Sequence, residues 1–199
     1  EKVTVTITEK SDEVTYDGQE HTISGYESMV SDNDLYNATT SVKVTETAEW
    51  TVTETNVGTY DMGIVAGDFE NTNANFTNVE FVVVDGQLKI NPYAEKVTVT
   101  ITEHSGSEKY DGSEKTVTGY DVEISNTLYK ETDFTFSGTA EAKRTDAGTT
   151  NMGLKPEQFA NNNPNFDTVT FNVTDGYQAI TPISAALGGA SGLSTLMMM

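Results

Sequence analysis

Apolar and polar residues alternate one position at a time along much of this chain. Val3, Val5 and Ile7 share one phase, the threonines between them share the other, and residues 97–102 repeat the alternation. A period of two residues places successive side chains on opposite faces of a strand. The pattern therefore predicts half-buried antiparallel strands, with apolar side chains toward a core and threonine toward solvent.

The same alternation marks further predicted strands, and short signals separate them. Asp-Gly pairs at 17–18, 111–112, 85–86 and 175–176 predict early and late hairpins. One short stretch in each half has helical character, at 154–159 with Pro156 near its start, and at 64–69. The further strands are predicted from Val42, Val44, Ala48, Trp50 and Val52; Phe134, Phe136, Ala140 and Ala142; Phe81 and Val83; Phe171 and Val173.

The sequence contains two copies of nearly the whole pattern. Residues 1–9 and 95–103 are both EKVTVTITE, and later landmarks return at offsets that fall from 94 to 90. A period this long corresponds to one domain per copy. We expect two tandem domains, 1–92 and 93–183, joined by a short linker into a semi-rigid rod, followed by an apolar small-residue tail at 184–199.

The fold class predicted for both domains is all-β. Two Ig-like β-sandwiches arranged end to end fit the many short strands and turns best. The alternative is a β-grasp-like sheet that carries the one short helix of each copy. The uncharged tail has two interpretations, the start of a C-terminal membrane anchor or a flexible linker.

Charge and cysteine content exclude several classes of function. The net charge is −20, and a polyanion of this size is repelled by nucleic acids and by anionic lipid surfaces. The chain has no cysteine, which excludes disulfides and thiolate metal sites. We expect a hydrated, acidic monomer that contacts a membrane only through an anchor in the tail.

The sequence contains none of the recognised catalytic motifs that we considered. No nucleophile elbow, HExxH motif or phosphate loop occurs, so we expect no enzyme activity and no cofactor. Asp32 and Asp34 are candidate ligands for a hard cation such as calcium. A solvated acidic loop is the preferred interpretation, because the spacing of a recognised calcium loop is absent.

Tyr16 and Tyr110 begin the best retained short motif, Tyr-Asp-Gly. Each tyrosine is a candidate ligand contact, as an exposed aromatic platform for a sugar or peptide. The structural interpretation, which we prefer, is a turn anchored by tyrosine in which glycine adopts a positive φ. Asn37, Asn75 and Asn172 match the N-glycosylation pattern, which a chain rich in Asn and Thr also produces by chance.

Taken in order, these motifs resemble a known repeat family. The order of motifs is YDG, GY, LY, GT-x-x-MG, N-x-NF and DG, and the second copy adds DAGT at 146–149 and VTDG at 173–176. This series resembles the YDG/MBG-like tandem repeats of large bacterial cell-surface proteins. The resemblance covers residues 1–183 and departs from the pattern at Thr150, where the first copy has Tyr60. It implies an extracellular, adhesin-like protein, often of a Gram-positive bacterium, with no catalytic residues to transfer.

Three functions follow from this resemblance. The lead hypothesis is a stalk segment that holds a distal domain away from the cell. The alternatives are a module that binds a host glycan or host protein, and accessory β-domains that flank an enzyme in a longer chain. Stalk domains of this kind also suggest an isopeptide bond, for which Lys96 and Asn172 are the candidates in the second copy only.

Overall fold

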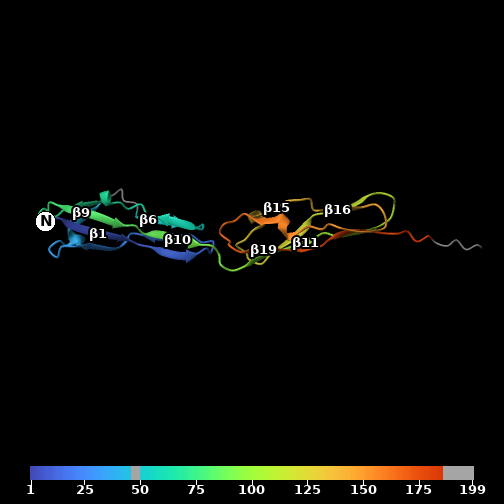
Figure 1. Cartoon of the computed structure of the whole chain (residues 1–199), viewed down its shortest axis with the longest axis horizontal. Helices are drawn as coiled ribbons and strands as arrows, with labels where there is room; N and C mark the ends of the chain where they lie inside the picture. Colours follow the sequence, from blue (N-terminus) through green and yellow to red (C-terminus); the bar gives the residue numbers. More distant parts are fainter. Residues whose placement is uncertain (46–49, 186–199) are drawn as a thin grey trace, which may run out of the picture. The chain divides into compact units, whose positions relative to one another are not determined.

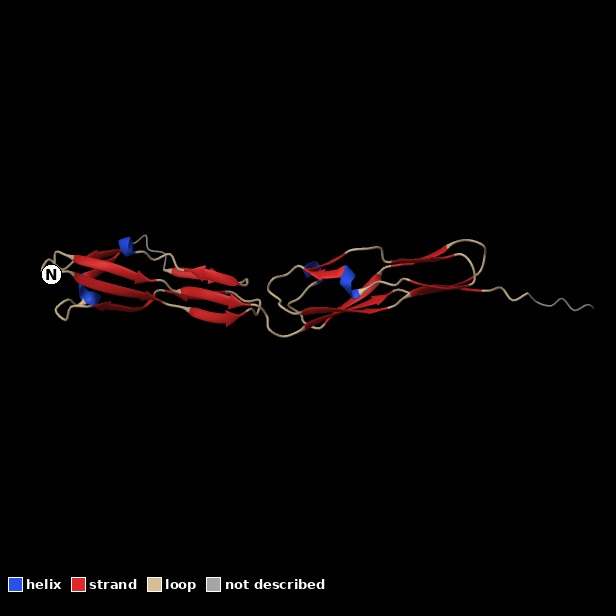
Figure 2. Cartoon of the chain, viewed as in Figure 1, coloured by secondary structure: helices blue, strands red, loops and turns tan. Residues whose placement is uncertain are grey.

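The computed structural model describes residues 1–45 and 50–185, and this part of the chain is all-β (Figure 1). Strands predominate and the helices are single turns (Figure 2). The first copy contains β1 (Val3–Glu9), β2 (Asp12–Thr15), β3 (His21–Ser24), β4 (Tyr26–Ser31), β5 (Val42–Val44), β6 (Thr51–Glu54), β7 (Gly58–Asp61), β8 (Phe69–Asn71), β9 (Val79–Val84) and β10 (Gln87–Asn91).

The second copy repeats this series. Its strands are β11 (Val97–Glu103), β12 (Gly106–Lys109), β13 (Lys115–Thr118), β14 (Tyr120–Ile124), β15 (Phe134–Phe136), β16 (Glu141–Arg144), β17 (Gly148–Asn151), β18 (Phe159–Asn161), β19 (Val169–Thr174) and β20 (Tyr177–Thr181). The helical turns are α1 (Ala38–Ser41), η1 (Ala66–Asp68), η2 (Glu131–Asp133) and η3 (Pro156–Gln158).

The strands form small sheets with the same plan in both copies. Two three-stranded sheets, β4-β1-β9 and β2-β10-β7, and two pairs, β3-β6 and β5-β8, make up the first copy. The second copy has β14-β11-β19, β12-β20-β17, β13-β16 and β15-β18. The predicted antiparallel pairing is found for β1 with β4 and for β7 with β10. It is wrong for β1 with β9 and for β2 with β10, which pair in parallel.

The predicted hairpins at the Asp-Gly pairs are also wrong. The strands on either side of Gly86, β9 and β10, belong to different sheets, and so do β2 and β3 on either side of Gly18. At these points the chain crosses from one sheet to the next instead of folding back. Gly18 and Gly112 do have the positive φ of the turn prediction, 77° and 79°.

Two predicted strands are each divided in the structure. Residues 42–52 contribute β5 and β6, which pair with different partners, and Ala48 lies outside the described residues. Residues 134–142 contribute β15 and β16, and Gly138 between them has a φ of 149°. An alternation that keeps its phase through a break cannot reveal the break by itself.

The helical predictions hold as single 3₁₀ turns, η1 and η3. Two further turns, α1 and η2, have no signal that we recognised in the sequence. Asn37, which matches the glycosylation pattern, is the N-cap of α1, and its side-chain oxygen accepts hydrogen bonds from the Thr39 and Thr40 amides.

The core confirms the faces predicted for the first strand of each copy. Val3, Val5 and Ile7 of β1 are at most 1% exposed, and the threonines between them are half-buried. Their counterparts in β11 are fully buried. Burial of these branched side chains supplies the main stabilising free energy of each β-layer.

By its internal contacts the chain divides into two compact units. Unit 1 contains residues 1–98, 124–135 and 161–170, and unit 2 contains residues 99–123, 136–160 and the chain from 171 onward. Residues 124–135 and 161–170 of the second copy therefore group with the first. The domain boundaries predicted at 92 and 183 stay a prediction.

None of the described helices has the length and apolar composition required to cross a membrane. The tail for which an anchor was one interpretation lies almost entirely beyond residue 185, outside the described residues.

Candidate functional site

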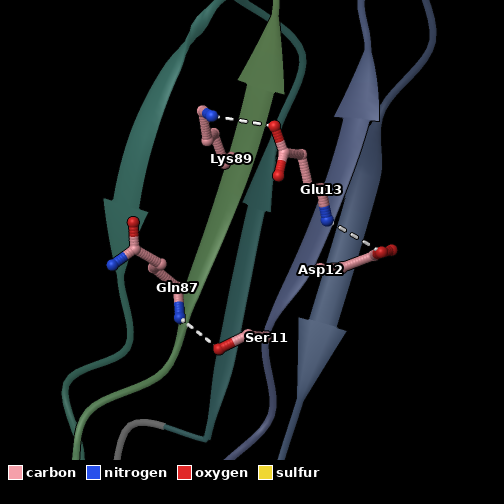
Figure 3. A pocket seen from close by; sticks show the side chains of 5 residues that line it. All are labelled: Ser11, Asp12, Glu13, Gln87 and Lys89. Carbon is pink, nitrogen blue, oxygen red and sulfur yellow. Dashed lines mark hydrogen bonds and ion pairs between the residues drawn. The ribbon is translucent and has the colours of Figure 1, made fainter.

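A shallow polar hollow lies along the parallel pair β2 and β10 (Figure 3). Its volume is about 520 Å³. The parallel register sets Leu88 beside Asp12 and Lys89 beside Glu13, so polar side chains of both strands reach the same surface. The lining residues are Ser11, Asp12, Glu13, Gln87 and Lys89.

An exposed ion pair dominates the hollow. Lys89 Nζ donates to Glu13 Oε1 at 2.7 Å, and Asn91 Nδ2 donates to the same oxygen at 2.8 Å. These two hydrogen bonds, with that from Lys89 the stronger influence, lower the pKa of Glu13. Glu13 therefore stays a charged acceptor at neutral pH, and it is poorly suited to proton transfer.

The hollow offers hydrogen-bonding groups and no nucleophile activated by a base. A carboxylate, an ammonium and the amide of Gln87 can bind the hydroxyls of a polar ligand such as a sugar. In the second copy the positions of Glu13, Lys89 and Asn91 are occupied by Ser107, Ala179 and Thr181. The charged part of the hollow thus belongs to the first copy alone.

A pair of buried glutamates is retained in both copies, and sequence reasoning missed it. Glu9 is 2% exposed and Glu103 is 4% exposed. Glu103 Oε1 accepts from the Leu154 amide at 2.7 Å, while its Oε2 accepts from Gly176 at 2.7 Å and Gly153 at 3.3 Å. The signal was available, because each glutamate continues the buried phase of the valines and isoleucine before it.

Each carboxylate ties the end of its strand to loops that are distant in sequence. In the first copy the Gly86 amide donates to Glu9 Oε2 at 2.6 Å. Glu9 Oε1 is buried and has no hydrogen bond of good geometry within the described residues, although the Ile64 amide also acts on this carboxylate and lowers its pKa. Buried carboxylates bonded to backbone amides hold loops in place, and both of these lack the open access that a substrate would need.

Burial raises the pKa of Glu9 above its ordinary 4.5, although the Gly86 amide opposes the shift. Because the folded pKa exceeds the unfolded one, folding is favoured by proton uptake. We expect the free energy of unfolding to gain a contribution as the pH falls from 7 through the folded pKa. That contribution is complete below about pH 4.5 and is absent in Glu9→Gln.

The measurement is urea denaturation at pH 7 and at about pH 5. Glu13→Gln is the matched control, because the pKa of Glu13 is shifted down and its removal should leave the gain between these two pH values intact. Equal pH dependence in the unmodified chain and Glu9→Gln would contradict the expectation.

The two candidate cation ligands lie in an exposed loop after β4. Asp32 Oδ1 accepts from the Thr4 amide at 2.8 Å, and the Asp32 amide donates to the Thr4 carbonyl at 3.0 Å. Asp32 therefore extends the pairing between β1 and β4, which is a structural role. Within residues 1–45 and 50–185, no group of three acidic or histidine side chains is placed to hold a metal ion.

The two candidate ligand-contact tyrosines have different surroundings. The Tyr16 ring lies edge-on to Phe166 with the ring centres 5.5 Å apart, whereas Tyr110 is 38% exposed. Their backbones are held alike, since the Tyr16 amide donates to Asn91 and the Tyr110 amide to Thr181. The motif thus anchors the end of a sheet in both copies.

Lys96 and Asn172 are both exposed, and the structure does not bring them together. The residue after Lys96, Val97, donates its amide to the Thr168 carbonyl. Asn172 lies four residues further along an extended strand, a distance of about 13 Å. The isopeptide bond stays a prediction that this register does not favour.

Compared with protein-family models, with curated proteins and with solved structures, the chain gives no significant match.

Proposed function

We propose that this chain is a non-catalytic spacer segment of an extracellular, adhesin-like protein on a bacterial surface. In this proposal its copies are two tandem Ig-like β-sandwich domains, 1–92 and 93–183, with a β-grasp-like fold as the alternative. The cellular location is supported by the resemblance to YDG/MBG-like repeats. The spacer role is supported by one observation above all, the parallel pairing of strands from the two ends of each copy.

This pairing suits a domain that carries tension. In the first copy β1 runs parallel to β9, with Val3 beside Val79 and Thr8 beside Val84, and β2 runs parallel to β10. A force that pulls the two ends of the copy apart drags these neighbours in opposite directions along their length. All the hydrogen bonds of the pair then share the load. In the second copy β12 and β20 are likewise parallel.

The comparison of the two copies also supports a spacer role. The buried glutamates, the sheet plan and the glycines at the sheet crossings occur twice. The charged residues of the hollow occur once. Selection for a ligand shared by both copies would retain the hollow, whereas selection for load-bearing retains the scaffold.

Single-molecule force spectroscopy tests this role. Cysteine handles in Glu1→Cys/Glu95→Cys load the parallel pairs β1–β9 and β2–β10 in shear. Handles in Lys2→Cys/Asn78→Cys open the β1–β9 pair from one end. The chain has no cysteine of its own to interfere. We expect an unfolding force several-fold higher in shear, because opening from one end breaks the bonds one at a time. Equal forces would remove the support for a spacer.

The hollow between β2 and β10 favours a second candidate function, a glycan-binding module. Its hydrogen-bonding groups belong to the first copy, so one ligand per chain would bind there. Glycan-array binding that is lost in Lys89→Ala and kept in Lys43→Ala, an exposed lysine on β5, would favour this function over the spacer role. An array without binding would leave the spacer as the better account.

A further inference from the structure

Two kinds of surface meet inside unit 1. One, here called the loop face, consists of Leu128, Asn165 and Phe166. The other, here called the sheet-end face, consists of Tyr16, Gly18, Asn56, Val57 and Tyr93. All eight residues belong to unit 1.

The contact between the two faces is specific. Asn165 is 6% exposed, its Oδ1 accepts from the Val57 amide at 2.8 Å, and its Nδ2 donates to Asn56 Oδ1 at 2.9 Å. Phe166 is 2% exposed and lies between the rings of Tyr16 and Tyr93, at centre distances of 5.5 and 5.7 Å. A buried amide with both ends bonded fixes register, and the rings supply apolar contact.

Leu128 completes the loop face by closing over a glycine. A Cβ atom on Gly18 would lie 2.9 Å from Leu128 Cδ2, so a side chain there would push the leucine away. The retained Tyr-Asp-Gly motif thus provides both an aromatic ring and a flat backbone for the neighbouring loops.

The first copy carries a second loop face, made of Leu35, Asn75 and Phe76, that is built by the same bonds. Asn71 Nδ2 donates to the Phe76 carbonyl at 2.7 Å, as Asn161 does to Phe166 at 3.1 Å. Each phenylalanine ring also lies edge-on to a buried tyrosine, at 5.2 Å in the first copy and 5.0 Å in the second. The loop is therefore already in the conformation that binds.

This second loop face is uncovered. Leu35 is 84% exposed, the largest exposure of any large apolar side chain that the structure describes. Asn75 is exposed and Phe76 is only half-buried. Their counterparts Asn165 and Phe166 are almost fully buried because a sheet-end face covers them.

The second copy carries a second sheet-end face. It consists of Tyr110, Gly112, Asp146, Ala147 and Ile183, which correspond in sequence to the five residues of the first. The sheet β12-β20-β17 brings them to one end, since Lys109 pairs with Thr181 and Gly148 with Ile180. Tyr110 is 38% exposed, Ile183 is 66% exposed, and nothing lies within 4 Å of a Cβ on Gly112.

The chemistry of this face matches that of the first. By position in the repeat, Ala147 corresponds to Val57 and offers the donor amide, while Asp146 corresponds to Asn56 and offers a carboxylate as acceptor. Ile183 replaces Tyr93 with another large apolar side chain. Three exposed large apolar side chains, Leu35, Tyr110 and Ile183, thus fall on two surfaces whose counterparts bind each other, and Leu35 and Ile183 are the two most exposed of their kind in the described residues.

We propose that the loop face of Leu35, Asn75 and Phe76 is a docking site for the sheet-end face of Tyr110, Gly112, Asp146, Ala147 and Ile183 on a second copy of this chain. The contact is head to tail, so each chain has one free face of each kind and the contact can propagate from chain to chain. The proposal stands on these contacts and does not depend on the spacer role.

The association is weak between separate chains. The faces are small, and a charge of −20 on each chain opposes their approach. We expect a dissociation constant on the order of 1 mM, similar to the effective concentration that a short linker provides. Salt screens the repulsion and strengthens the contact.

Two variants that each block one face test the proposal. Leu35→Asp blocks the loop face and Ile183→Asp blocks the sheet-end face, and both positions are exposed enough to leave the fold intact. Sedimentation velocity at about 1 mM chain in raised salt should show association of the unmodified chain. Either variant alone should stay monomeric, and an equimolar mixture should form dimers that do not grow further.

The mixture distinguishes this contact from others. A monomeric mixture would overturn the proposal, as would a monomeric unmodified chain under the same conditions, whatever other partner the face has. Association of either variant alone would show that another surface is used. Val65→Asp is the matched control, because Val65 is 58% exposed and belongs to neither face; it should associate as the unmodified chain does.

Discussion

Replacing Gly86 by alanine is expected to destabilise the first copy strongly. A Cβ atom at this position would lie 2.1 Å from the Lys10 carbonyl oxygen and 2.8 Å from Glu9 Cβ. The obstacle is backbone, which cannot move aside without breaking the strand pairs around it. Overpacking costs about 1–3 kcal/mol and occasionally more, and a rigid backbone obstacle places this site at the upper end, a large part of the stability of a small domain.

The loss of stability in Gly86→Ala comes only from the steric clash of the added methyl group. Gly86 is not among the glycines with positive φ, and alanine keeps the amide that bonds Glu9. Gly67→Ala is the matched control in the same copy, because nothing lies within 4 Å of its Cβ and its φ is ordinary. We expect its free energy of unfolding by urea to change by less than about 0.5 kcal/mol. Similar stabilities for Gly86→Ala and Gly67→Ala would contradict the close approach of Gly86 to the Lys10 backbone.

Replacing Glu103 by alanine is expected to destabilise the second copy by about 3–5 kcal/mol. The change removes the acceptor of the Leu154, Gly176 and Gly153 amides. Leu154 is only 5% exposed, so water cannot easily replace the lost carboxylate. Each buried donor left without a partner costs about 1–3 kcal/mol.

Urea denaturation measures the loss, and hydrogen exchange locates it. The Leu154 and Gly176 amides should exchange much faster in Glu103→Ala. Glu103→Gln should recover part of the stability, because its oxygen can accept from one amide while its NH₂ group faces the other. Glu123→Ala, an exposed glutamate on β14, is the control and should be nearly neutral. Unchanged exchange in Glu103→Ala would show that the carboxylate does not hold these loops.

Sequence patterns predicted some residues of the candidate sites but could not predict which of them meet in space. The candidates Asp32 and Asp34 follow from residue type, and Lys96 and Asn172 from their places in a first and a last strand. Neither criterion says which residues lie opposite each other in the sheet. Glu13 and Lys89 are 76 residues apart in the chain and meet only because β2 and β10 are parallel neighbours. No short motif contains both, so sequence reasoning had no means of pairing them.

The repeat carried more information about structure than the individual motifs did. Tyr16 and Tyr110 have the same sequence context, yet one ring is covered by Phe166 and the other is exposed. Two identical motifs can differ in this way because exposure depends on what packs against them. The comparison of the copies in the structure, position by position, is what distinguishes a covered face from an open one.

By itself the sequence determined the all-β class, the buried face of β1 and β11, the positive φ of Gly18 and Gly112, and the existence of two copies. These properties depend on local periodicity and on self-similarity, which neighbouring residues encode. Only the tertiary structure decided the parallel pairings, the sheet crossings at Gly86 and Gly176, and the backbone amides that Glu9 and Glu103 bond. Those depend on contacts between residues about 75 positions apart, where the choice of partner is made by packing of the whole core.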